Sequence, residues 1–110
     1  MTNPPLPPDV EAALRRVARE TRAHRIVLFG SRARGDHHAD SDWDVAVIVP
    51  DDTLPGQVTR ETLRPLYRGT ALEVHPIRQG LYLRARKQAG TLSRSIAEDG
   101  IELDVMAGAV

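Results

Sequence analysis

Apolar side chains recur at helical spacing directly after Asp9. The recurring positions are Val10, Leu14, Val17 and Thr21, with Ala13 and Ala18 beside them. This spacing places one apolar stripe along a single helix face, which predicts an amphipathic helix packed against a core. Aspartate is a residue type that caps helix N-termini, so Asp9 is expected to begin this helix.

Short runs rich in apolar and β-branched residues predict the strands of a sheet. The runs cover residues 25–29, 45–49, 71–77 and 101–103. The first run is continuously apolar after Arg25 and ends at Gly30, which is typical of a strand buried on both faces. Proline cannot continue a sheet ladder, so Pro50 ends the second strand.

Further helices are predicted between and after the strands. They cover residues 57–68, 81–88 and 91–99. Pro65 is the weak point of the first, and Gly100 ends the last. With a turn and helix after Gly30, the order is α, β, turn and helix, β, α, β, α, α, β. This order describes helices packed against a small mixed sheet, an α+β fold.

The chain has 110 residues, a length that predicts a single domain. Residues 1–8 hold four prolines, which remove backbone donors and disfavour helix, so a flexible lead is expected before one domain over residues 9–110. This lead contains no apolar run long enough for a signal peptide or a membrane span. A cytoplasmic protein that does not associate with membranes is therefore expected.

Charge and cysteine content exclude several classes of function. Fifteen acidic and fifteen basic residues give a formal net charge of zero, so no overall field attracts DNA or RNA, and direct nucleic-acid binding is not expected. The absence of cysteine excludes disulfides, thiolate catalysis and zinc ribbons. Any bound metal must therefore use oxygen or imidazole ligands.

Gly-Ser-Arg-Ala-Arg-Gly, at residues 30–35, follows the first predicted strand. Backbone amides at such a helix start can hold an anionic phosphate. A P-loop is excluded because Asp36 and His37 stand where lysine and serine or threonine are required, and a dinucleotide motif is excluded because Arg32 replaces its second glycine. A plain tight turn is the alternative reading.

Asp42 and Asp44 enter the second predicted strand. Residues two apart in an extended chain point to the same face, about 7 Å apart at their Cα atoms, so both carboxylates can converge on one cation or a close pair. Trp43 must then face the other way. A calcium loop is excluded because Val45 stands where that loop needs glycine. The alternative is that both aspartates lie on a solvent-exposed strand start.

Glu73 is a carboxylate inside the third predicted strand, where Leu72 and Val74 flank it on the opposite face. If it meets Asp42 and Asp44, each like-charge pair near 5 Å is unfavourable by about 3 kcal/mol at an effective dielectric of about 20. Divalent cations remove this repulsion. The alternative is that Glu73 lies on the open face of the sheet, where His75 would share its side and could hydrogen-bond to it.

Gly30 and Ser31, then Asp42-Trp43-Asp44, then a later strand carboxylate form a combination that strongly resembles the minimal nucleotidyltransferases of the DNA polymerase beta superfamily. The likeness covers residues 25–104. It implies a polymerase-beta-like nucleotidyltransferase fold. Larger relatives carry an added domain that binds the acceptor, and a chain of this size has no room for one, so the acceptor is expected to be a separate molecule.

The resemblance also implies roles for individual residues. Gly30 and Ser31 would hold the triphosphate of ATP. Independently of the resemblance, Arg32 and Arg34 could add charge-assisted contacts to phosphate oxygens, and the alternative for each is a solvated surface arginine. Asp42 and Asp44 would bind two magnesium ions, and Glu73 would bind one of them and help activate the attacking hydroxyl. The family usually has aspartate at the third position and an aliphatic residue in place of Trp43, so the sequence departs from the pattern at both.

Many chains of this size resemble the antitoxin half of toxin–antitoxin pairs whose partner is a helical HEPN ribonuclease. That likeness implies transfer of AMP from ATP to a tyrosine of the toxin, with release of pyrophosphate. Two alternatives stay open. The chain could neutralise its toxin by binding alone, or it could transfer nucleotides to a small molecule or to RNA.

Overall fold

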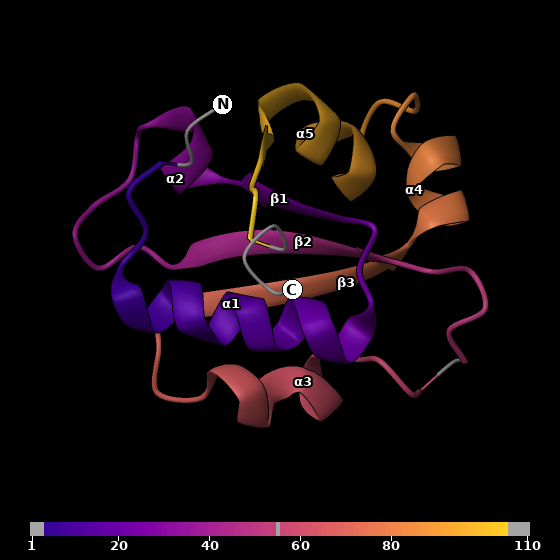
Figure 1. Cartoon of the computed structure of the whole chain (residues 1–110). Coiled ribbons are helices and arrows are strands. Elements are labelled where there is room, and N and C mark those ends of the chain that lie inside the picture. The colour runs from indigo at the N-terminus through magenta and orange to yellow at the C-terminus, as the bar shows by residue number, and fades with distance from the viewer. Residues whose placement is uncertain (1–3, 55, 106–110) are drawn as a thin grey trace.

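A computed structural model describes residues 4–54 and 56–105, which form a four-stranded mixed sheet with helices on both faces (Figure 1). The predicted α+β class and the predicted order of elements are confirmed. In chain order the elements are α1 Pro8–Thr21, β1 Arg25–Phe29, α2 Ser31–Arg34, β2 Trp43–Val49, α3 Arg60–Tyr67, β3 Leu72–Arg78, α4 Gln79–Ala85, α5 Leu92–Asp99 and β4 Ile101–Glu102. In these described residues, no helix has both the length and the apolar character needed to cross a membrane.

The strands lie in the order β3-β2-β1-β4. β1 runs antiparallel to both β2 and β4, whereas β2 and β3 are parallel. A parallel pair needs a crossover connection, and α3 supplies it between β2 and β3. Pro76 lies in the edge strand β3, where its missing N–H donor can face away from the ladder.

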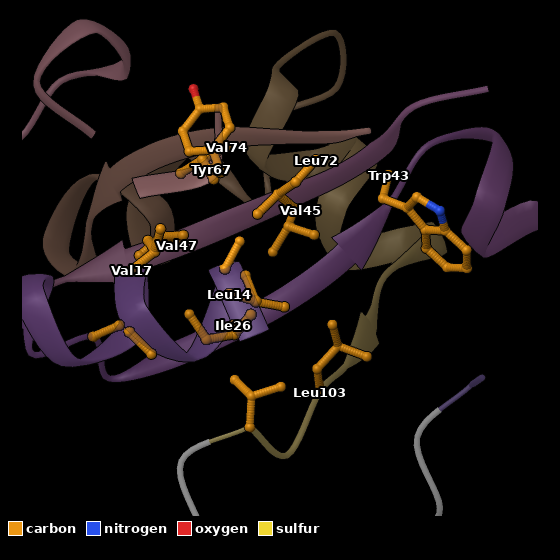
Figure 2. Close-up of a cluster of buried hydrophobic side chains, with 14 of the residues drawn as sticks. Leu14, Val17, Ile26, Trp43, Val45, Val47, Tyr67, Leu72, Val74 and Leu103 are labelled. Atoms are coloured by element: carbon orange, nitrogen blue, oxygen red, sulfur yellow. The ribbon is translucent and has the colours of Figure 1, made fainter. Parts of the chain in front are cut away.

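Two apolar clusters lie on opposite faces of the sheet. α1 and α3 cover one face, and α4 and α5 pack on the other (Figure 1). Leu14 and Val17 of α1 point towards Val45 and Val47 of β2, and Trp43 lies at one end of the same cluster (Figure 2). The apolar stripe predicted for the first helix is confirmed, because all six of its positions are buried.

Several boundaries differ from the predicted ones. Asp9 is in the first turn of α1 and is not its cap, because the helix begins at Pro8 after Pro7. Proline suits the first helical position, where its missing N–H loses no hydrogen bond. The predicted flexible lead thus ends one residue early, and residues 1–3 and 106–110 lie outside the described residues. α3 begins at Arg60, because the Thr59 side chain accepts a hydrogen bond from Thr62 N and caps the helix there.

Candidate active site

Asp44 lies at the centre of a row of side chains that crosses three strands. The register pairs it with Phe29 of β1 on one side and with Glu73 of β3 on the other. Its neighbours Trp43 and Val45 belong to the apolar cluster under α1, so Asp44 points to the opposite face. The register of the sheet therefore places Asp44 and Glu73 side by side on one face.

The turn between β1 and α2 approaches Asp44 closely at Gly30. A Cβ atom added to Gly30 would lie 3.0 Å from Asp44 Oδ2, a distance that real Cβ atoms reach only with displacement of a neighbour. Gly30 also has φ 77° and ψ −156°, a backbone region that is essentially restricted to glycine. The missing side chain therefore brings the Gly-Ser turn directly against the carboxylate, with half-buried Ser31 as the first residue of α2.

His75 lies beside Asp44. Its Nε2 atom is 3.2 Å from Asp44 Oδ1, and the carboxylate accepts a hydrogen bond when that nitrogen carries the proton. The imidazole also meets the ring of Phe29 edge-on, with centroids 5.1 Å apart. The sequence placed His75 on the face of Glu73 and allowed a bond between those two. The structure instead gives its ring to Asp44, which it orients.

Glu73 is held by an arginine that the sequence reading did not identify. Arg60 Nη2 at the start of α3 donates to Glu73 Oε2 across 2.7 Å. This hydrogen bond raises the pKa of the Arg60 guanidinium above its usual value. An arginine is charged at all working pH values in any case. Glu73 thus has a permanent cationic partner in this structure. Since α3 is a separate element, nothing in the local sequence around Glu73 indicates the pair.

The three expected carboxylates do not surround one point. Asp42 precedes β2 and is exposed, Asp44 is bound to His75, and Glu73 is bound to Arg60. Within residues 4–54 and 56–105, no group of three or more potential ligands is arranged to hold a metal ion. The chemistry of the donors still suits magnesium, since both aspartates offer the oxygen ligands that this cation prefers. The absence of a Cβ at Gly30 leaves space beside Asp44 Oδ2.

For Glu73 to bind a cation, its carboxylate must leave Arg60. Exposed ion pairs of this kind contribute about 0.2–1 kcal/mol, which corresponds to a factor of about 1.4 to 5 in a binding constant. We therefore expect Arg60→Gln to lower the dissociation constant for a divalent cation by about that factor. A calorimetric titration with magnesium measures it. Arg64→Gln, on the exposed surface of the same helix, controls for the loss of one positive charge; an equal shift in both variants would contradict a specific role for the pair.

Arg32 makes contacts within the chain that the sequence did not predict. Its Nε and Nη2 atoms donate to the carbonyl oxygen of Ser41 at 3.3 and 3.0 Å, and Nη2 also donates to Ala39 at 3.2 Å. The guanidinium lies over the Trp43 ring, 4.5 Å from its centroid. These contacts join α2 to the loop that leads into β2, and the phosphate contact of Arg32 stays a prediction.

A surface groove lies away from these residues, at the other end of the same strands. It has a volume of about 380 Å³ and a mainly apolar lining that includes Val49 and Arg78. These are the last residues of β2 and β3, whereas Asp44 and Glu73 lie near the first residues of the same strands. We assign the candidate site to the carboxylates and not to the groove, because the groove offers no comparable set of polar groups.

Comparisons with known proteins identify the family of the chain. A family model described as a nucleotidyltransferase domain matches residues 10–102. The chain is similar in structure to a crystal structure of a toxin–antitoxin with AMP-PNP, at 25% sequence identity and a TM-score of 0.54, over 84% of this chain and 70% of that chain. It is also similar to a candidate nucleotidyltransferase from Sulfolobus solfataricus, at 16% identity and a TM-score of 0.54, over 84% of this chain and 78% of the other. That second likeness bears on the fold alone. No curated protein matches the chain.

Proposed function

Because the chain belongs to the nucleotidyltransferase domain family, we propose that it transfers AMP from ATP to a hydroxyl group of a protein partner. One observation carries the proposal. The Gly-Ser turn meets the Asp44 carboxylate so closely that a Cβ at Gly30 would lie 3.0 Å from Oδ2. A turn able to hold phosphate oxygens and a carboxylate able to hold a cation therefore share one point, as transfer of a nucleotide requires.

In the proposed site, Gly30 and Ser31 hold the triphosphate, and Asp42 and Asp44 bind magnesium. Magnesium held by these carboxylates would supply the positive charge that neutralises phosphate oxygens and favours attack at the α-phosphorus. His75 fixes the orientation of Asp44 through the contact between Nε2 and Oδ1, a role that hydrogen-bonded neighbours of metal-binding carboxylates commonly have. Glu73 is the third carboxylate proposed to bind magnesium, which it can do only after its ion pair with Arg60 opens.

At the α-phosphorus, the reaction forms one bond and breaks one. The acceptor hydroxyl oxygen attacks the α-phosphorus of ATP, and the bond from that phosphorus to the bridging oxygen breaks. Pyrophosphate leaves with the electron pair of the broken bond. The hydroxyl proton passes to a carboxylate base, for which Glu73 is the proposed residue because it lies opposite Asp44 in the register. AMP is then bound to the acceptor, pyrophosphate is released and the proton is on Glu73.

The proposed acceptor is a toxin protein. The similar crystal structure of a toxin–antitoxin with AMP-PNP supports this partner and supports an adenine nucleotide as the donor. We propose specifically that the acceptor is a tyrosine of a helical HEPN ribonuclease and that its modification silences the toxin. In this proposal the chain is the antitoxin and works in the cytoplasm.

A transfer assay tests the proposal. The chain is incubated with magnesium, ATP labelled at its α-phosphorus and the candidate toxin, and the label is located by mass spectrometry. We expect label on a toxin tyrosine, lost when EDTA is added and lost in Asp42→Asn. Label that appears on RNA or on a small molecule in an acceptor screen without toxin would identify a different acceptor. If no acceptor is labelled, or if the label is equally strong in Asp42→Asn, the proposal that the chain is an enzyme is contradicted.

A second function is favoured by the Arg60–Glu73 pair. Because Glu73 is already neutralised by an arginine at 2.7 Å, the chain could instead act by binding its toxin alone, with no transfer of nucleotide. The double variant Asp42→Asn, Asp44→Asn separates the two functions. Neutralisation of the toxin would persist in this variant if binding alone suffices, and it would be lost if transfer is required.

A further inference from the structure

Asp42 lies between two peptide groups that are both fixed from outside the loop. The carbonyl oxygen of Ser41, in the peptide group before Asp42, accepts two hydrogen bonds from Arg32. The N–H of Trp43, in the peptide group after Asp42, donates to Ala71 O at 2.8 Å. Fixing both peptide planes restricts the φ and ψ angles of the residue between them, and these angles set the direction of its side chain.

Arg32 contacts the residues on both sides of Asp42. Its guanidinium holds the Ser41 carbonyl and also stacks on the ring of Trp43, 4.5 Å from the centroid. Trp43 is buried, with 8% of the residue exposed, so its ring offers a rigid platform. A planar guanidinium can hydrogen-bond in its plane while stacking on its face, which a lysine ammonium cannot do.

Arg32 also contacts the turn formed by residues 38–41. His38 N donates to Ser41 Oγ at 2.8 Å and Ser41 N donates to His38 O at 3.1 Å, which closes residues 38–41 into a turn. Arg32 also binds the Ala39 carbonyl within this turn. One side chain of α2 therefore ties a polar turn to the first residue of β2, and Asp42 is the residue between them.

We propose that Arg32 is a positioning residue, which fixes the conformation of Asp42 by bridging the Ser41 carbonyl and the Trp43 ring. Its action on metal binding rests on the function proposed above, whereas its action on the loop does not. The tryptophan that departs from the family pattern then has a physical purpose. It supplies the aromatic face on which the arginine stacks, which an aliphatic residue cannot provide.

Three variants test the proposal. Arg32→Ala removes the guanidinium, and Arg32→Lys keeps the charge without the planar fork. Arg34→Ala is the matched control, because Arg34 lies on the same short helix but pairs with Asp36 and Asp99 and not with the 39–41 turn. Thermal unfolding confirms that each variant folds. Trp43 is the only tryptophan, so its fluorescence reports the stacked ring without further labelling.

Two measurements report on the loop before β2 and do not require an enzyme assay. Amide hydrogen exchange over residues 35–42 is expected to be about tenfold faster in Arg32→Ala, the factor associated with losing one charge-assisted hydrogen bond. Acrylamide is expected to quench Trp43 more strongly in that variant. Arg32→Lys is expected to give intermediate values, and Arg34→Ala to match the wild type. Wild-type exchange and quenching in Arg32→Ala would overturn the proposal.

Two further measurements connect the loop to the site. We expect the dissociation constant for Mn²⁺, measured by electron paramagnetic resonance, to rise about 10- to 100-fold in Arg32→Ala, as for other residues that orient metal ligands. The KM for ATP at saturating metal is expected to stay near the wild-type value. A rise in that KM alone, with an unchanged loop, would show that Arg32 contacts phosphate and would overturn the proposal. If the wild type neither binds Mn²⁺ nor transfers AMP, the proposed function fails, and exchange and quenching still decide whether Arg32 fixes the loop.

Discussion

Asp44→Asn is expected to lower the rate of AMP transfer on the order of 10³-fold, the loss seen when a group that stabilises transition-state charge is removed. Asp44 is the central residue of the site, since it meets Gly30, His75 and the row that leads to Glu73. Asparagine keeps the shape and the oxygen that faces His75, but it lacks the charge that binds a divalent cation. The initial rate of labelled AMP transfer measures the effect.

Asp40→Asn is the control for this variant. Asp40 is also an acidic residue of the loop before β2 and is exposed, yet it lies outside the proposed site. It is expected to keep the wild-type rate, and both variants are expected to unfold at the wild-type temperature. Transfer by Asp44→Asn at more than a tenth of the wild-type rate would contradict the assignment of Asp44 as a magnesium ligand.

Gly30→Ala is expected to reduce both stability and activity. At φ 77° and ψ −156° a side chain destabilises the folded state by about 1–3 kcal/mol. Its Cβ would in addition lie 3.0 Å from Asp44 Oδ2, so either the carboxylate or the turn must move. Misplacement of a reacting group by a fraction of an ångström to 1 Å can lower the rate on the order of 10²-fold. Urea unfolding followed by Trp43 fluorescence and the AMP transfer rate measure the two effects.

Gly35→Ala separates backbone strain from contact with the carboxylate. Gly35 also has a left-handed conformation, at φ 89°, but a Cβ there would meet no atom within 4 Å. Alanine in that region destabilises by about 1–2 kcal/mol. We therefore expect a comparable loss of stability with activity preserved. If Gly35→Ala lost as much activity as Gly30→Ala, the close approach to Asp44 would not be the cause.

Much of the fold could be predicted from the chain because the periodicity of apolar residues is a local property. The stripe from Val10 to Thr21 and the apolar run from Ile26 to Phe29 each identify their element without reference to any other. Element ends were less well predicted, because they depend on caps and on neighbours. Thr59 starts α3 later than the pattern suggests, and Asp51, from the loop after β2, accepts from Gly80 N in the first turn of α4.

For the candidate site, the sequence predicted side-chain alternation within each strand but not the partners of the side chains. Alternation puts Glu73 and His75 on one face of β3 and Asp44 opposite Trp43 and Val45 in β2, because the side-chain period of a strand is two. The register between the strands then brings Asp44 and Glu73 to one face, whereas Asp42 precedes β2 and is exposed. Alternation could not determine that Arg60 would hold Glu73 or that His75 would choose Asp44. Arginine and histidine reach several possible partners, and the choice among them depends on how α3 and the two strands pack.

The sequence by itself therefore determined the elements of this protein, the alternation of side chains along each strand and the position of its Gly-Ser turn, because each follows from spacing within one short segment. Only the tertiary structure decided which charged groups meet. Arg60 and Glu73 are 13 residues apart, and Asp44 and His75 are 31 apart. Contacts over such separations form only when the sheet closes and the strands take their register, so no local pattern specifies them.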